Sequence, residues 1–230
     1  MSEHASAWEL LLTGDPTLFA IVRLSLVVSL SAVALSALIG MPLGAGLALV
    51  RFRGRAASVV ALNAMMGLPP VVVGLAVYLL LSRSGPLGAL GILFTPTAMI
   101  IAQTILIVPI IAALTRQTVQ DLWVEYRDEL AAMAVGPFGR IATLLWDARL
   151  SLLTALLAGF GRAAAEVGAV MIVGGNIDGF TRTMTTAVAL ETSKGNLPLA
   201  LGLGLILLAI VVVVNAAAWA MRAWSERQLG

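Results

Sequence analysis

The chain has 230 residues, of which 60% are hydrophobic and 11% are charged. Because soluble domains are about 45–50% apolar and about 25% charged, this composition excludes an ordinary soluble domain and indicates a membrane protein. Cysteine is absent and the single histidine is His4, which excludes a disulfide framework and the usual zinc sites. The net charge of +2 is too small to favour nucleic acid as a partner.

Long uncharged runs predict the membrane-spanning helices, since about 20 apolar residues cross a bilayer. Such runs cover Leu24–Val50, Ala56–Ser82, Ser84–Thr115 and Gly195–Met221. A further span, Leu150–Ile177, is interrupted by Arg162 and Glu166. The expected fold class is therefore all-α: a polytopic membrane protein with about five transmembrane helices, forming one domain over residues 18–222.

Arginines predict the orientation of the spans. The regions after the first, third and fifth spans carry Arg51, Arg53, Arg55, Arg116, Arg127, Arg140, Arg149, Arg222 and Arg227. The opposite side keeps only Arg23, Arg83, Arg182 and Lys194. Because basic residues accumulate on the cytoplasmic side, residues 1–17 are expected to be an external segment and residues 223–230 a cytoplasmic tail.

The second span contains two successive prolines, Pro69 and Pro70, which free backbone carbonyls within the membrane. Irregular backbone at that depth is tolerated where it is buried in protein or lines a cavity. A bend beside a transport path and a simple packing kink are both open. The same ambiguity applies to Asn63 and to Gln103, which either face a path or bridge helices.

Residues 116–148 carry many charges in a helical pattern. Asp121, Glu125 and Asp128 are spaced to share one helix face, and Gly136-Pro137 then breaks the helix. A short amphipathic stretch follows. We expect a cytoplasmic helix–turn–helix with an acidic stripe and exposed aromatic side chains such as Trp123 and Phe138. It is either a docking surface or a solvated connector.

The fourth span holds one arginine and one glutamate four residues apart, Arg162 and Glu166. Ionisable residues in lipid usually pair or face a water-filled path, and this spacing allows them to pair on one helix face. A pathway role and a structural pair are both open, and the structural pair is favoured, because a carboxylate beside an anion path is counterproductive. Gly174-Gly175-Asn176 is expected to end the helix and begin an external loop, 174–197, with Asn176 a candidate for lining the path.

Motifs for enzyme chemistry are missing from the sequence. No G-x-x-x-x-G-K-[ST] phosphate loop, G-x-S-x-G elbow or H-E-x-x-H pair occurs. We expect no catalytic residues, no metal and no cofactor, and therefore a protein that is not an enzyme.

Two stretches carry a family likeness. Asp128–Phe138 (DELAAMAVGPF) is similar to the E-A-A-x-x-x-G loop of ABC importer permeases, with Asp128 where Glu is usual and Ala134 where Gly is usual. Gly159–Gly168 (GFGRAAAEVG), followed by Met171–Ile177 (MIVGGNI), is similar to the next helix of oxyanion permeases. The chain thus resembles the permease subunit of bacterial ABC importers of the molybdate/sulfate/tungstate type, and Thr181–Ala187 (TRTMTTA) makes it most like tungstate permeases.

The resemblance implies a type I importer permease that passes an oxyanion across the inner (plasma) membrane. Its partners would be a cytoplasmic ABC ATPase dimer that binds the ATP, an external oxyanion-binding protein, membrane lipid and a second copy of this chain. The residues implied to engage the ATPase are Asp121, Glu125, Asp128, Glu129, Ala134, Gly136, Pro137 and Phe138. Molybdate or sulfate transport, and a non-transporting scaffold for an ATPase, are the alternatives.

Overall fold

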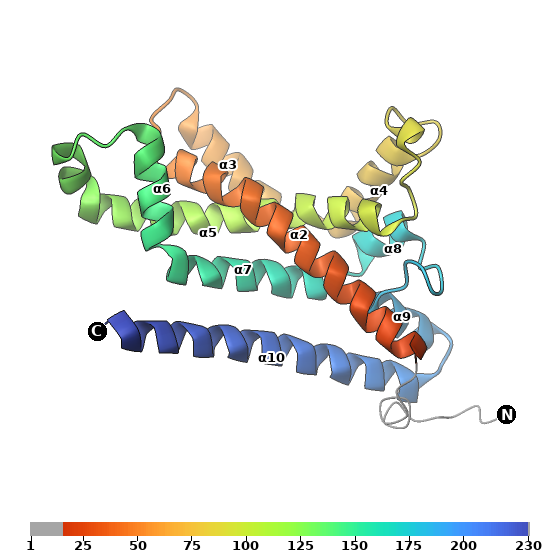
Figure 1. Cartoon of the computed structure of the whole chain (residues 1–230). Helices are drawn as coiled ribbons and strands as arrows, with labels where there is room; N and C mark the ends of the chain where they lie inside the picture. The colour runs from red at the N-terminus through yellow and green to blue at the C-terminus, as the bar shows by residue number, and fades with distance from the viewer. Residues whose placement is uncertain (1–15, 230) are drawn as a thin grey trace. The chain divides into compact units, whose positions relative to one another are not determined.

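The computed structural model describes residues 16–229, and side chains from 17 to 224. Most of the predicted external segment, residues 1–17, therefore lies outside the described residues. Within the described part the chain is helical, without strands (Figure 1). The elements are α2 (Pro16–Leu49), α3 (Arg55–Met66), α4 (Pro70–Leu81), η1 (Gly88–Leu90), α5 (Pro96–Ala132), α6 (Pro137–Asp147), α7 (Arg149–Ala164), α8 (Gly168–Gly174), α9 (Met184–Ser193) and α10 (Leu197–Leu229).

Three helices are each long and apolar enough to cross a membrane: Thr17–Leu49, Pro96–Ala132 and Leu197–Trp224. Two broken pairs, α3 with α4 and α6 with α7, raise the number of candidate spans to five if each pair is one span. The all-α polytopic fold expected from composition is therefore confirmed.

Several boundaries differ from those expected. The third span does not end at Thr115, because α5 continues to Ala132 and carries the acidic stripe on the same helix. The fourth predicted span, Leu150–Ile177, is not one helix but α7 and α8 with a break between them. At the C-terminus α10 continues to Leu229, into the residues predicted as a tail.

The chain divides into two compact units. Among the described residues, the first unit takes 16–32, 69–103 and 161–229, and the second takes 33–68 and 104–160. Each unit has its own packing, which positions one of the two candidate sites.

In the second unit, α2 packs closely on α5 through two glycines one turn apart, Gly40 and Gly44. A Cβ atom on Gly44 would lie 2.3 Å from the carbonyl oxygen of Ala112, so a larger residue would push the helices apart. Small residues allow such backbone approach between membrane helices. Arg55, at the start of α3, donates hydrogen bonds to the carbonyls of Leu47 (2.7 Å) and Ala48 (3.2 Å) near the end of α2.

In the first unit, α4 packs on α8 and α9 packs on α10 (Figure 1). A Cβ atom on Gly74 would lie 2.8 Å from Cα of Ala169, so these two short helices touch along their backbones. The N-terminal part of α2 joins α9, because the backbone N–H of Met184 donates to Oγ of Ser25 at 2.8 Å.

Candidate functional site

The first candidate site is the break between α7 and α8, which holds the two ionisable residues of the fourth predicted span. Arg162 lies in the last turn of α7, where a cation is favoured by the helix dipole. Glu166 lies past the end of that helix. Its Oε2 pairs with Nη1 of Arg162 at 2.5 Å, and the Glu166 side chain is only 3% exposed. The expected pair is therefore present, although it spans a helix end and not the face of one helix.

The second oxygen of Glu166 serves the next helix. The backbone N–H of Ala169 donates to Oε1 of Glu166 at 2.9 Å. Ala169 lies in the first turn of α8, whose N–H groups have no partner within the helix. One buried carboxylate thus closes the C-terminal end of α7 through Arg162 and the N-terminal end of α8 through a backbone amide.

Two other helices satisfy carbonyl groups at the break. Nε2 of Gln103, on α5, donates to the carbonyl of Ala163 at 3.2 Å. The hydroxyl of Thr185, on α9, donates to the carbonyl of Glu166 at 2.8 Å. The break is therefore held by side chains from elements far apart in the sequence, which explains why the local pattern predicts a continuous span. We name Arg162, Glu166, Gln103 and Thr185 the break cluster.

The break cluster shows little that would bind an oxyanion. The Arg162 charge is paired, and the amide donor of Gln103 is already used. Oε1 of Gln103 is buried without a hydrogen-bond partner among the described residues, and so is Oδ1 of Asn176. Both are acceptors, and an anion requires donors. The geometry suits a structural joint better than an anion-binding site.

The end of α8 follows the expected C-cap chemistry. Gly175 adopts a left-handed conformation (φ 71°), and its N–H donates to the carbonyl of Met171 at 3.0 Å. Asn176 is also left-handed (φ 50°), which asparagine tolerates better than most residues. The hydroxyl of Thr181 then donates to the carbonyl of Gly174 at 2.6 Å, so the chain turns tightly into the following loop.

The remaining residues proposed to line a path are dispersed. Pro69 is the N-cap of α4 and Pro70 is its first residue, and α3 and α4 meet there at a bend of 99°. Proline at the first helical position costs no hydrogen bond. Asn63 is exposed on α3 and belongs to the second unit, whereas Pro69 and Pro70 belong to the first. The structure brings together Gln103, Arg162 and Glu166 from this set.

The second candidate site is the turn between α5 and α6 with its flanking residues, 121–138, which we name the coupling segment. The residues Asp121, Glu125, Asp128, Glu129, Ala134, Gly136, Pro137 and Phe138 are all exposed. Phe138 is 88% exposed, an unusual state for a large aromatic residue. Exposed apolar side chains rimmed by charge are typical of interaction surfaces.

The turn itself has a defined geometry. Ala134 adopts a left-handed conformation (φ 52°). The N–H of Val135 donates to the carbonyl of Leu130 at 3.2 Å, and the N–H of Ala134 donates to that of Ala131 at 3.0 Å. This is the Schellman pattern, which usually has glycine at the left-handed position. The position of Ala134 is the one at which the family motif has glycine.

The coupling segment packs on a small apolar core. Its buried members are Ala45, Ala48, Val119, Leu130 and Leu144. Trp123 packs against this core, with the Arg140 guanidinium 5.5 Å from the centre of its ring, so the expectation that Trp123 is exposed is wrong. An amphipathic pattern does not reveal that both faces of a helix are used. The exposed aromatics are instead Phe138 and Trp146.

The sequence did not predict that the side chains of Thr185, Arg55 and Arg140 donate hydrogen bonds to carbonyl groups at helix ends or turns. Arg140 donates to the carbonyl of Val135 at 2.8 Å, which fixes α6 against the turn. Thr185 is 19 positions from its partner Glu166, and no local signal marks it. Basic residues just past a helix end, such as Arg55, are a weak signal for this role.

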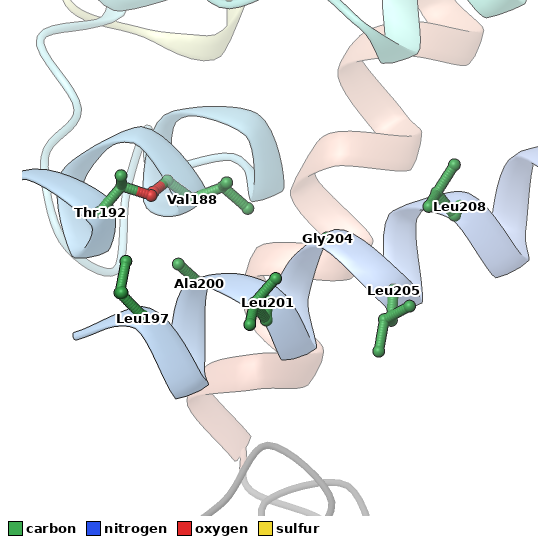
Figure 2. A pocket seen from close by; sticks show the side chains of 8 residues that line it. All are labelled: Val188, Thr192, Leu197, Ala200, Leu201, Gly204, Leu205 and Leu208. Atoms are coloured by element: carbon green, nitrogen blue, oxygen red, sulfur yellow. The ribbon is translucent and has the colours of Figure 1, made fainter. Parts of the chain in front are cut away.

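A groove along α9 and α10 is apolar and is unsuited to anions (Figure 2). It has a volume of about 540 Å³. Leu201, Leu205 and Leu208 of α10 line it, and Thr192 is the one polar side chain among the described residues that line it. Without a charged side chain or several donors, this groove offers an oxyanion nothing to replace its hydration.

Comparison with known proteins supplies the family. No family model matches the chain. It is 47% identical to a protein of Haloferax volcanii named "probable anion ABC transporter permease protein", over 78% of this chain and 80% of that protein. It is 39% identical to the tungstate uptake system permease protein TupB of Peptoclostridium acidaminophilum, over 94% of this chain and 95% of that protein. It is 28% identical to the molybdenum transport system permease protein ModB of Azotobacter vinelandii, over 74% of this chain and 78% of that protein. The chain belongs to the family of oxyanion ABC transporter permeases.

Proposed function

We propose that this chain is the membrane subunit of an ATP-driven tungstate importer. One observation carries the choice of anion: the sequence identity to a tungstate permease is 39% over nearly the whole chain, against 28% over about three quarters of it for a molybdenum permease. Tungstate and molybdate are nearly isosteric dianions, so geometry alone does not separate them. Molybdate or sulfate remains the second candidate.

The coupling segment is the proposed docking site for a cytoplasmic ATPase. Its exposed carboxylates lie in the C-terminal part of α5 and Phe138 lies in the first turn of α6, next to the core that contains Leu130 and Leu144. This subunit supplies no ATP site or other cofactor of its own. ATP binding by two partner ATPases would draw together the coupling segments of two copies of this chain, and the helices attached to them would change which side of the path is open.

The proposed topology follows from the arginines. The N-terminus lies outside and the C-terminus in the cytoplasm, in the plasma membrane (the inner membrane of a Gram-negative cell). The region 174–197 then faces an external oxyanion-binding protein, and residues 116–148 face the ATPase. Anion selectivity resides largely in the binding protein, because a conducting path must bind its substrate weakly.

The break cluster has a structural role in this proposal. The side chain of Glu166 is only 3% exposed, and both oxygens of its carboxylate are bonded within the chain. Arg162→Ala should then lower the amount of assembled complex. Normal assembly combined with lost uptake would instead assign Arg162 to the path.

The test is uptake of radiolabelled tungstate at nanomolar concentration by cells with and without the gene. Gene-dependent uptake that resists excess molybdate and sulfate is the expected result. Gene-dependent uptake that molybdate abolishes would indicate a shared molybdate and tungstate system. Unchanged uptake after deletion would contradict the substrate assignment, and a purified complex that moves no solute would favour a membrane scaffold.

A further inference from the structure

A hollow of about 590 Å³ lies beside Arg23 in the N-terminal part of α2. Phe19, Leu24 and Val27 of α2 line it, together with Phe180 from the loop between α8 and α9. All these residues belong to the first compact unit. No residue that lines the hollow belongs to the break cluster or to the coupling segment.

The charge of Arg23 is uncompensated in the described part of the chain. No carboxylate there forms a salt bridge with it, and none of the residues lining the hollow is acidic. Arg182, another arginine of the same unit, is by contrast paired with Asp178 at 2.9 Å. Arg23 is exposed, so its guanidinium is available to a partner outside the chain.

The position of Arg23 along the span indicates which anions its guanidinium can reach. The candidate span begins at Thr17, so Arg23 lies about 9 Å along the helix axis from that end at 1.5 Å per residue. With Thr17 placed at the membrane surface, this distance reaches the boundary between the polar headgroups and the outermost acyl carbons. An unpaired arginine there extends toward the interface, where lipid phosphates are the most abundant anions.

The side chains around Arg23 suit acyl chains. Phe19 and Val27 lie one turn before and one turn after it on the same helix face, 58% and 50% exposed, and Phe180 is 50% exposed. Aromatic residues are enriched at this level of a bilayer. A cation with apolar side chains on either side matches a molecule with an anionic head and hydrocarbon tails.

The groove of Figure 2 provides the contrast. It is of similar volume and apolar, but no charged side chain lines it, so it can accept hydrocarbon without selecting a headgroup. We propose that the hollow at Arg23 is a binding site for an anionic phospholipid, whose phosphate is bound by the guanidinium. The site does not depend on which oxyanion the protein carries.

Native mass spectrometry of the full-length protein, purified in mild detergent with its co-purifying subunits, tests the site. The probe is phosphatidylglycerol, with a diacylglycerol of the same chains and inorganic phosphate as comparisons. Arg23→Gln should weaken phosphatidylglycerol binding about five-fold, the effect expected for one basic residue at an anionic membrane surface. Arg23→Lys and Arg83→Gln, the latter at an exposed arginine in the turn after α4, should bind as the wild type does.

Equal binding of phosphatidylglycerol by Arg23→Gln and the wild type would overturn the proposal. Displacement of the lipid by inorganic phosphate would also overturn it, since the site would then be one for free anions. Diacylglycerol should bind with the same affinity to Arg23→Gln and the wild type. If Arg23→Gln does not yield folded protein, Phe180→Ser provides the readout: it should weaken phosphatidylglycerol binding, and unchanged affinity would contradict the proposal.

Discussion

The break between α7 and α8 and the turn between α5 and α6 both interrupt helices and both carry charge, yet their polar groups find partners in different places. At the break, Glu166 is buried and every oxygen of its carboxylate is bonded within the chain. At the turn, the carboxylates and Phe138 are exposed on a supported helix end. The polar groups of the first region are bonded within the chain, as in a structural joint. Those of the second region are exposed to a partner, as on a docking surface. Substitutions should therefore separate folding from assembly.

The largest expected effect is on folding, at the break. Glu166→Ala removes the partner of Arg162 and the acceptor for the Ala169 amide. Breaking a buried pair costs about 3–5 kcal/mol, and we expect about 3 kcal/mol here because Arg162 keeps some exposure. Thermal unfolding in detergent measures the loss. Glu129→Ala, at an exposed carboxylate, is the matched control, and equal stability of the two variants would contradict the joint.

The next effect is on assembly, at the turn. Phe138→Ala should leave the free energy of unfolding within about 0.5 kcal/mol, because the ring is already in solvent. It should weaken association with the ATPase by about 2 kcal/mol, the scale of an aromatic interface anchor. Affinity capture of the ATPase provides the measurement. Phe52→Ala, at another exposed ring in the same unit, should have no effect, and equal losses from both would remove the specificity claimed for Phe138.

A smaller effect tests the contribution of α9 to the break. Thr185→Val removes the hydroxyl that donates to the Glu166 carbonyl. Loss of one such hydrogen bond costs about 1–2 kcal/mol when the acceptor stays unsatisfied. Thr192→Val is the control, since that exposed hydroxyl bonds only to its own helix. Calorimetry that finds the same unfolding temperature for both variants would remove Thr185 from the break cluster.

The smallest effect has the opposite sign. Ala134→Gly should stabilise the turn by up to about 1 kcal/mol. The left-handed conformation costs an L-residue about 1–2 kcal/mol, and the greater conformational entropy of glycine in the unfolded chain offsets part of the gain. Ala131→Gly, three positions earlier and inside α5, should destabilise by about 1 kcal/mol. Both are compared by thermal unfolding. A loss of stability in Ala134→Gly would show that the left-handed geometry carries no strain.

Features that depend on local chemistry were predictable from the sequence. A segment that crosses lipid must satisfy its backbone hydrogen bonds internally, as an apolar helix does, so the composition predicted the all-α membrane fold. Pro69-Pro70 and Gly136-Pro137 predicted interruptions in the helices, and α4 and α6 begin where these prolines lie. The pairing of Arg162 with Glu166 followed from their spacing and from the cost of leaving either alone.

Features that depend on distant contacts were not predictable. The break after Ala164 has no local breaker, and it is held by Gln103 and Thr185 from other helices. Trp123 is half-buried against a core to which α2 contributes Ala45 and Ala48, and no pattern within α5 reveals this contact. The left-handed turn at Ala134 contradicts the preference of alanine, and only the family motif marks the position.

The central claim is tested most directly in vesicles. The purified permease is reconstituted with its ATPase, the external binding protein is supplied with radiolabelled tungstate, and accumulation is followed with and without ATP. We expect accumulation against the gradient that requires ATP and that stops when the ATPase is omitted or when Phe138 is replaced by alanine. Accumulation without the ATPase, or accumulation of molybdate but not tungstate, would contradict it.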